Sequence, residues 1–283
     1  MRIEHQTLDQ ERALYGLRGA QVVDCTFAGP ADGESALKEC ADLQVSGCQF
    51  DLRYPLWHVT GASLTDCAMS DTCRAALWYD RDVQLTDCAL GGIKALRECA
   101  DVRLTRCKIQ SPEFGWQCDG VEMRECALEA EYPFLHSRNM TFDHLELTGK
   151  YSFQYVENVV IRDSVLNTKD AFWHSRNVTV YDSVVRGEYL AWYAQNLRLV
   201  RCKIIGTQPL CYVQGLVMED CQMEGADFAF EYSDVRATLR GEVISVKNPW
   251  HGFIQADRIG EIILDAYQKP DADCRIQVGE SGR

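Results

Sequence analysis

Two aspartates, Asp163 and Asp182, stand 19 residues apart in the same local context, each directly before a serine. Two carboxyl groups at a fixed separation are what hydrolysis of a glycosidic bond requires, one as acid and the other as base or nucleophile. We therefore expect Asp163 and Asp182 to be the acid and the base or nucleophile of any catalytic site. His174 and Arg201 are the residues that we expect to assist them.

These aspartates belong to a column of mostly charged residues that recurs along the chain. The column comprises Asp24, Asp66, Asp87, Arg106, Glu125, His144, Asp163, Asp182, Arg201 and Asp220. Carboxylates on neighbouring turns, ~4.8 Å apart, would raise the pKa of one of them by repulsion. A structural role is the alternative, because such side chains accept backbone N–H groups where a strand ends and the basic members compensate the charge.

Two adjacent columns rich in tryptophan, histidine and tyrosine are the second candidate site. The members that we assign to a ligand surface are Trp57, His58, Trp78, Tyr79, Trp116, His136, Trp173, Trp192 and Tyr193. If they face outward, they form a strip that can stack on sugar rings or other planar ligands, or pack against a protein. The alternative is that the tryptophans fill the interior at a wide corner, and the sequence pattern leaves both orientations open.

No motif for a metal or a cofactor is present, so we expect neither. The six histidines form no H-x-H or H-E-x-x-H pattern, which metal sites commonly use. The 14 cysteines include no C-x-x-C pair, which argues against a zinc site. Most cysteines recur at one position of a repeat, where a reduced thiol acts as a small apolar side chain.

The elements that must position these columns follow from a repeat of about 19 residues, which is the signature of a solenoid. Only glycine, aspartate and asparagine occur at one position of each repeat, and these residues tolerate positive φ angles, so each repeat has an obligatory turn there. The column comprises Gly19, Asp42, Gly61, Asp82, Asp101, Gly120, Asn139, Asn158, Asn177, Asn196 and Gly215. We expect the asparagine amides to bond from one turn to the next.

After this turn, apolar and polar residues alternate, as in Val178, Val180, Ser183 and Val185. A period of two is typical of strands with one buried face, and the alternation slips once per repeat, which indicates a corner. The pattern predicts an all-β fold, a single-stranded right-handed parallel β-helix of about 12 turns. The right-handed form is favoured because left-handed hexapeptide helices repeat in sixes.

The regularity of the repeat sets the expected boundaries. Residues 1–18 precede the first turn and should cap one end, residues 19–268 should form the β-helix, and residues 269–283 should form a C-terminal tail or cap. The segment that contains Gly29, Pro30 and Gly33 has extra residues, so we expect a loop there.

The composition limits the partners. A net charge of −13 argues against nucleic acid and against an anionic membrane surface. No apolar run is long enough to span a membrane, and the first ten residues lack the apolar region of a secretory signal. We expect a cytoplasmic protein that binds no nucleic acid and no membrane, and homo-oligomers are compatible with the sequence.

Several segments resemble one known family: ERALYG, TKDAFW, NVTVYDS, GEYLAW, AFEYS, SVKNP and ADRIGEIILD. The chain is similar over almost its full length to an uncharacterised bacterial domain-of-unknown-function family of the pectin-lyase-like right-handed β-helix superfamily. The resemblance implies the fold and its handedness. It implies no reaction, cofactor or catalytic residue.

Two functions follow as hypotheses. The first is a binding or scaffold protein that uses the aromatic strip to hold a carbohydrate, a small molecule or a protein partner. The second is a carbohydrate-active enzyme, a glycoside hydrolase or polysaccharide lyase, that uses the stacked carboxylates on one face. The absence of long loops favours the first, because active sites are commonly built from loops.

Overall fold

The computed structural model describes residues 1–29 and 34–279. The predicted loop residues Pro30 and Gly33 lie outside the described residues. The described part of the chain is all-β and contains no helix, and accordingly none that could cross a membrane. The chain forms two compact units, Met1–Glu146 and Leu147–Arg283, which are treated separately below.

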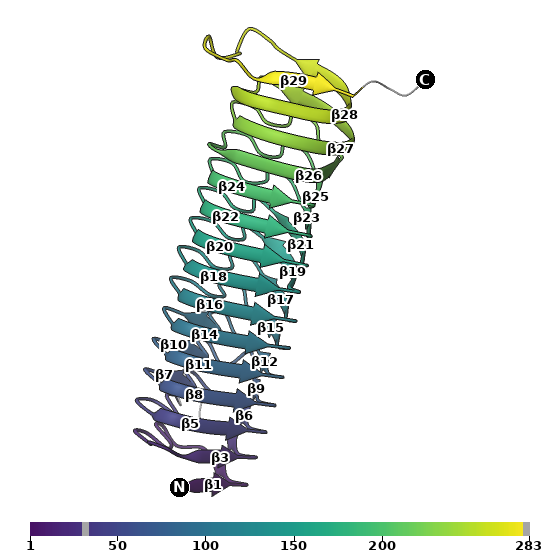
Figure 1. Ribbon diagram of the computed structural model, residues 1–283. Helices are drawn as coiled ribbons and strands as arrows, with labels where there is room; N and C mark the ends of the chain where they lie inside the picture. The colour runs from purple at the N-terminus through teal and green to yellow at the C-terminus, as the bar shows by residue number, and fades with distance from the viewer. Residues whose placement is uncertain (30–33, 280–283) are drawn as a thin grey trace. The chain divides into compact units, whose positions relative to one another are not determined.

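Unit 1 (Met1–Glu146) is built from strands on three sides of a coil (Figure 1). The first side has β1 (Arg2–Glu4), β3 (Gln21–Val23), β5 (Ala41–Ser46), β8 (Thr60–Thr65), β11 (Arg81–Thr86), β14 (Ala100–Thr105), β16 (Asp119–Arg124) and β18 (Arg138–Asp143). The second has β2 (Thr7–Leu8), β4 (Thr26–Phe27), β6 (Gln49–Phe50), β9 (Ala68–Met69), β12 (Ala89–Leu90), β15 (Lys108–Gln110) and β17 (Ala127–Ala130). The third has β7 (Leu56–Trp57), β10 (Leu77–Trp78) and β13 (Leu96–Arg97).

Unit 2 (Leu147–Arg283) continues the same alternation of a longer and a shorter strand. Its strands are β19 (Glu146–Lys150), β20 (Glu157–Arg162), β21 (Val165–Lys169), β22 (Arg176–Tyr181), β23 (Val184–Arg186), β24 (Gln195–Val200), β25 (Lys203–Ile205), β26 (Leu216–Glu224), β27 (Asp234–Lys247), β28 (His251–Ile263) and β29 (Arg275–Val278). β19 begins at the last residue of unit 1.

Within each unit, strands pair in parallel with their counterparts on the next turn, and the pairing is in register except for shifts between β26 and β27 and between β27 and β28. Equivalent residues therefore stack on most turns. Val178 pairs with Val159 on one side and with Leu197 on the other, and Val83 pairs with Ala62 and Val102. The predicted right-handed parallel β-helix is confirmed, with about 14 turns where we expected about 12 (Figure 1).

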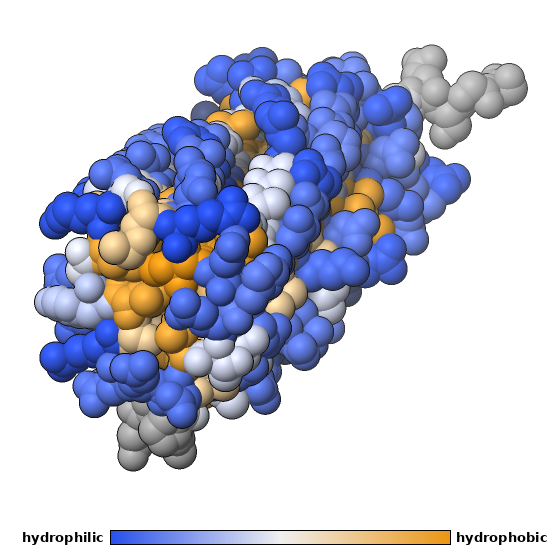
Figure 2. Space-filling view, turned by 90° about the horizontal axis from the view of Figure 1, so that it is seen from below, coloured by the Kyte–Doolittle hydropathy of each residue, from blue (hydrophilic) through white to orange (hydrophobic). Residues whose placement is uncertain are grey.

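Both terminal segments, which we expected to be caps, contain strands that pair with the neighbouring turn. Within residues 1–18, β1 and β2 pair in parallel with β3 and β4. Ile3 and Leu8 of this first turn are buried, and Figure 2, which looks onto the N-terminal end, shows apolar residues surrounded by hydrophilic ones. Beyond residue 268, β29 pairs with β28, so the C-terminal segment adds a further strand.

The predicted turn column is confirmed by the backbone, because each of its members has a positive φ angle. The asparagine ladder is present in unit 2, where Asn177 Nδ2 donates to Asn158 Oδ1 at 3.0 Å and Asn196 Nδ2 to Asn177 Oδ1 at 3.1 Å. The charged corner column also has positive φ, as in Asp163 (48°) and Asp182 (49°). A second left-handed residue in each repeat therefore produces the slip in the alternation.

At these left-handed corners, a backbone N–H group does not bond to the neighbouring strand. Small side chains inside the β-helix accept a hydrogen bond from it instead. The residue after the corner donates to the inward side chain on the next turn: Cys107 N to Cys126 Sγ (3.4 Å) and Ser164 N to Ser183 Oγ (3.0 Å). A buried unpaired N–H is costly, so cysteine and serine act there as acceptors as well as space fillers. All 14 cysteines are free, and 13 of them are buried.

On the third side of unit 2, residues 151–155, 170–174 and 189–193 form successive turns, and the last part of β27 adds strand pairing, where Val246 pairs with Ala229. Positive φ angles alternate along these turns, as in Asp170, Phe172 and His174, and then in Tyr189, Ala191 and Tyr193. Alternate left-handed residues bend the chain into an arc, with Phe172 buried inside and His174 exposed outside. This arc positions the aromatic columns.

Candidate functional site

Both aromatic columns face outward, which answers the question of orientation that the sequence left open. Trp57, Trp78 and Trp116 in unit 1, and Trp173 and Trp192 in unit 2, are half-buried. The residue after each tryptophan is more exposed, as in His58, Tyr79, His174 and Tyr193, and His136 is exposed at the equivalent position after Leu135. Because these five residues have positive φ angles, their side chains project from the corner.

In unit 2 the exposed column is a ladder of stacked rings, made of Tyr155, His174, Tyr193 and Tyr212. The ring centroids of successive members lie 4.9, 5.1 and 4.8 Å apart, with planes within 13° of parallel. In-register turns ~4.8 Å apart bring identical positions to the distance at which aromatic rings stack. The sequence shows which residues recur at this position. Their stacking depends on the left-handed backbone conformation at the corner, which directs each side chain outward.

The ladder ends at Tyr232, which follows Tyr212 by one residue more than the usual spacing of about 19. One extra residue shifts the register, so Tyr232 has the positive φ angle and its ring centroid lies 5.8 Å from that of Tyr212. Lys269 Nζ then lies 5.6 Å from the centroid of the Tyr232 ring. We define the unit 2 ladder as Tyr155, His174, Tyr193, Tyr212 and Tyr232.

The tryptophans beside the ladder are fixed by hydrogen bonds to the backbone. Trp173 Nε1 donates to Tyr189 O at 2.7 Å, and Trp192 Nε1 donates to Gln208 O at 2.9 Å. The two rings stack with centroids 5.5 Å apart and planes 2° from parallel. Because hydrogen bonds and stacking already fix these rings, little side-chain entropy would be lost when a partner binds them.

Unit 1 has a shorter stack with cations at its ends. Trp57 stacks on Trp78 at 5.2 Å, and Lys38 Nζ lies 4.0 Å from the centroid of the Trp57 ring. His58 stacks on Tyr79 at 5.0 Å. Trp116 is further along, with the Arg97 guanidinium 5.3 Å from its ring centroid. A hydrogen bond with the Glu98 carboxylate raises the pKa of Tyr79.

These stacks determine which part of each ring a ligand can reach. Ring faces inside a stack are covered by the rings on the neighbouring turns, so the side chains present their edges, with tyrosine hydroxyl and imidazole N–H groups. Stacking on a sugar requires an uncovered face. The ladders instead offer hydrogen bonds and edge contacts over a regular surface.

The predicted catalytic aspartates lie at a different corner and are exposed. Arg201 binds Asp182 through two hydrogen bonds of 2.6 Å, from Nε to Oδ1 and from Nη2 to Oδ2. These bonds hold the pKa of Asp182 below its usual range. Asp182 is therefore an ionised carboxylate, which can act as a base but not as a proton donor.

His174 and Asp182 are not brought together. His174 precedes β22, whereas Asp182 follows it, and a six-residue strand is roughly 20 Å long. Arg201, one turn further, reaches Asp182 and not His174. Of the four predicted catalytic residues, Asp182 and Arg201 form an ion pair at one corner, Asp163 occupies the same corner one turn earlier, and His174 belongs to the aromatic ladder.

One titratable residue was not singled out by the sequence. Asp80 follows Tyr79 and points into unit 1, fully buried. Its Oδ1 accepts the N–H of Val59 at 2.8 Å, and burial raises its pKa well above the ordinary value. The repeat indicates that Asp80 is buried, because Cys99, Cys118 and a serine occupy the same inward position on the following turns.

Among the described residues of either unit, no three histidine, cysteine, aspartate or glutamate side chains gather closely enough to share an ion. Burial also raises the pKa of Cys118 to about 12 and that of Cys211 to about 12. Such thiols stay protonated, and a protonated thiol is a poor ligand and nucleophile.

The chain matches a protein family described as "Protein of unknown function (DUF3737)" over residues 1–277. The protein belongs to this family. The expected family resemblance is thus confirmed, and the family brings no reaction with it. No curated protein matches the chain.

Solved structures similar to this member of the family include several β-helix proteins. The A-module of a mannuronan C-5 epimerase from Azotobacter vinelandii shares 8% identity, with 84% of this chain and 89% of that chain covered and a TM-score of 0.48. An exopolygalacturonase from Thermotoga maritima shares 6% identity, with 83% and 84% covered and a TM-score of 0.46. A mannuronic acid-specific lyase from human gut microbiota shares 9%, with 96% and 79% covered and a TM-score of 0.41.

Proposed function

We propose that this protein is a binding protein whose partner is another protein, which docks on the edges of the unit 2 ladder. The observation that carries the proposal is a row of aromatic side chains that is both exposed and ordered: Tyr155 is 47% exposed and Tyr193 is 45% exposed, although each stacks on a neighbour. Tyrosine and tryptophan are enriched at protein interfaces and dominate their binding energy.

The order of the ladder supports this choice of partner. Side chains that are free in the unbound protein lose rotamer entropy on binding, whereas these rings are already held by their neighbours. A regular surface of ring edges and hydroxyl groups suits a protein surface. Small molecules usually require a concave pocket, and stacked sugars require uncovered ring faces.

The alternative is a carbohydrate-active enzyme that uses Asp163 and Asp182, and it stays a prediction. Asp182 paired with Arg201 suits the role of base or nucleophile. The required general acid is a carboxyl group with a raised pKa, and Asp182 is shifted in the opposite direction. The cytoplasmic location, the absence of nucleic-acid and membrane partners and self-association also stay predictions.

The test is site-specific photocrosslinking in cells that express the protein. p-Benzoylphenylalanine replaces Tyr193 in the ladder or, as a matched control, Tyr181, an outward tyrosine of β22 on another face of the same turn. We expect a specific crosslinked protein from position 193 and none from position 181. The same product from both positions, or no product from position 193, would contradict the proposal.

A second measurement uses the crosslinked protein after it has been identified and purified. Tyr193→Ala should weaken its binding roughly tenfold or more, as for a residue at the centre of an interface. Tyr193→Phe, which keeps the stack, should have a smaller effect, and Asp182→Asn should have none. Unchanged binding by Tyr193→Ala, with far-ultraviolet circular dichroism preserved, would rule out the ladder as the contact surface.

A further inference from the structure

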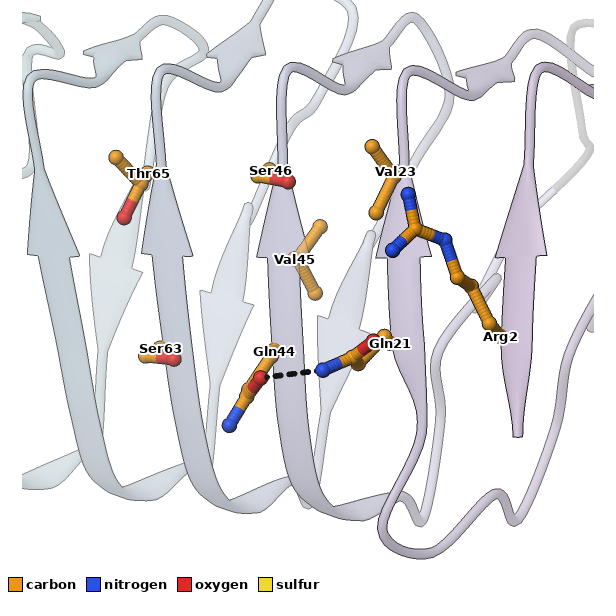
Figure 3. Close-up of a pocket in the computed structure, with 8 residues that line it drawn as sticks. All are labelled: Arg2, Gln21, Val23, Gln44, Val45, Ser46, Ser63 and Thr65. Carbon is orange, nitrogen blue, oxygen red and sulfur yellow. Dashed lines mark hydrogen bonds between the residues drawn. The ribbon is translucent and has the colours of Figure 1, made fainter.

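A polar groove crosses the outer face of β3, β5, β8 and β11 in unit 1, away from the aromatic columns. Two hollows of about 400 and 240 Å³ both have Gln44 and Ser63 in their lining and are therefore adjacent. Figure 3 shows the first of them, where Arg2, Gln21, Gln44, Ser46, Ser63 and Thr65 line a face formed by adjacent strands. All of these residues belong to one unit.

The hollow arises from the sizes of stacked outward residues. In-register pairing places Gln21, Gln44, Ser63 and Gln84 in one row and Val23, Ser46, Thr65 and Thr86 in the next. Ser63 is short between two glutamines, and Ser46 and Thr65 are short beside it, so the surface dips there. The row continues with Arg103, which forms an ion pair with Glu122 at 3.4 Å, and these long side chains end the groove.

The lining offers neutral hydrogen-bonding groups. Gln21 Nε2 donates to Gln44 Oε1 at 3.0 Å (Figure 3), which orders both amides. Each amide still has capacity to bind, because an NH₂ group has two hydrogens and a carbonyl oxygen accepts two bonds. Ser46, Ser63 and Thr65 add hydroxyls that donate and accept. Arg2 lies at one end of the groove, and Asp42 and Asp82 line the other.

We propose that this groove binds an uncharged oligosaccharide that lies along the direction in which β3, β5, β8 and β11 are stacked. Sugar hydroxyls donate and accept at once, and the amide and hydroxyl rows supply both partners on every turn. An anionic chain would require a row of cations, and the lining has only Arg2. The site is independent of the proposed docking surface, so each can fail without the other.

The test is calorimetric titration of the full chain with linear hexasaccharides. The neutral probes are β-1,4-glucan, α-1,4-glucan and β-1,4-mannan, and the anionic probe is oligogalacturonate. We expect saturable binding of at least one neutral probe, with the anionic probe weaker. Absence of binding by all neutral probes at millimolar concentration, or tighter and salt-sensitive binding of oligogalacturonate, would overturn the proposal.

Matched variants locate the site. Thr65→Tyr fills the groove and should abolish binding, whereas Thr105→Tyr, in the same row beyond the groove on β14, should leave the affinity unchanged. Tyrosine is accommodated in this row, because Tyr181 occupies the equivalent position in unit 2. Gln44→Ala should weaken binding roughly fivefold through loss of a hydrogen bond. Equal effects of the two tyrosine variants would overturn the assignment.

Discussion

Asp80→Asn should stabilise the protein at pH 8 and change its stability little near pH 4. Asp80 is fully buried, and burial raises the pKa of its carboxyl group in the folded state. In the unfolded chain that pKa is about 3.9. Above this pH the unfolded chain releases the proton while the folded protein retains it, so ionisation favours unfolding. Each pH unit between the unfolded-state and folded-state pKa values costs about 1.4 kcal/mol.

The measurement is the free energy of unfolding by urea at several pH values between 4 and 8. The difference between the variant and the parent should grow with pH, because asparagine does not ionise. Ser137→Ala, which alters the same inward position on a later turn without changing a titratable group, should leave the pH dependence as it is in the parent. A difference for Asp80→Asn that stays constant across this range would show that the carboxyl group is not the source.

A further variant tests the hydrogen bond that Asp80 makes. Asp80→Ser keeps an acceptor for the N–H of Val59, as Ser137 does for Cys118 on a later turn at 2.9 Å. Asp80→Val removes that acceptor and leaves a buried N–H unpaired, at a cost of about 1–3 kcal/mol. The serine variant should therefore be the more stable of the two at every pH.

Phe172→Ala should lower the free energy of unfolding by about 3–5 kcal/mol, the usual loss for a fully buried phenylalanine. Phe172 is 1% exposed, and its ring stacks on Phe153 with centroids 5.1 Å apart. It also lies two residues before His174, so the cavity should loosen the ladder directly outside it. Urea unfolding measures the first effect, and the near-ultraviolet circular dichroism of the tyrosines and tryptophans measures the second.

Phe172→Leu is the matched control, because Leu210 occupies the equivalent buried position two turns later with the same positive φ. A substitution that nearly conserves volume usually costs less than about 1.5 kcal/mol. Comparable losses for the alanine and leucine variants would mean that the backbone conformation at residue 172, rather than the filled volume, limits stability.

Most of the fold could be predicted from the sequence, because two of the left-handed positions in each repeat hold characteristic residue types. Only glycine, aspartate or asparagine occurs in the first turn column, and the charged corner follows five residues later, so the period and the register are visible. The cysteine and serine positions mark the buried side in the same way. Each of these signals is local and repeated, which makes it independent of tertiary packing.

The candidate site could be predicted only as a set of residues. The third left-handed corner holds bulky residues such as His58, Tyr79 and His174, which are not typical of positive φ angles, so the pattern could not indicate that the side chains project outward there. The pairing of Asp182 with Arg201, which prevents Asp182 from acting as an acid, also depends on side-chain geometry. Asp80 could not be predicted as a special residue, because it is a single carboxylate in an inward column that also holds cysteine and serine, such as Cys99 and Ser137.

The in-register pairing of β22 with strands on both sides has a consequence for how this protein can change its length. If residues 177–195 were removed, Asn196 would take the place of Asn177, and Val159 would face Leu197 as it now faces Val178. Every turn, corner and buried acceptor would find an equivalent partner. A whole turn can therefore be inserted or deleted without disturbing the pairing of its neighbours. Related chains can thus differ in the number of turns while the contacts between successive turns stay the same.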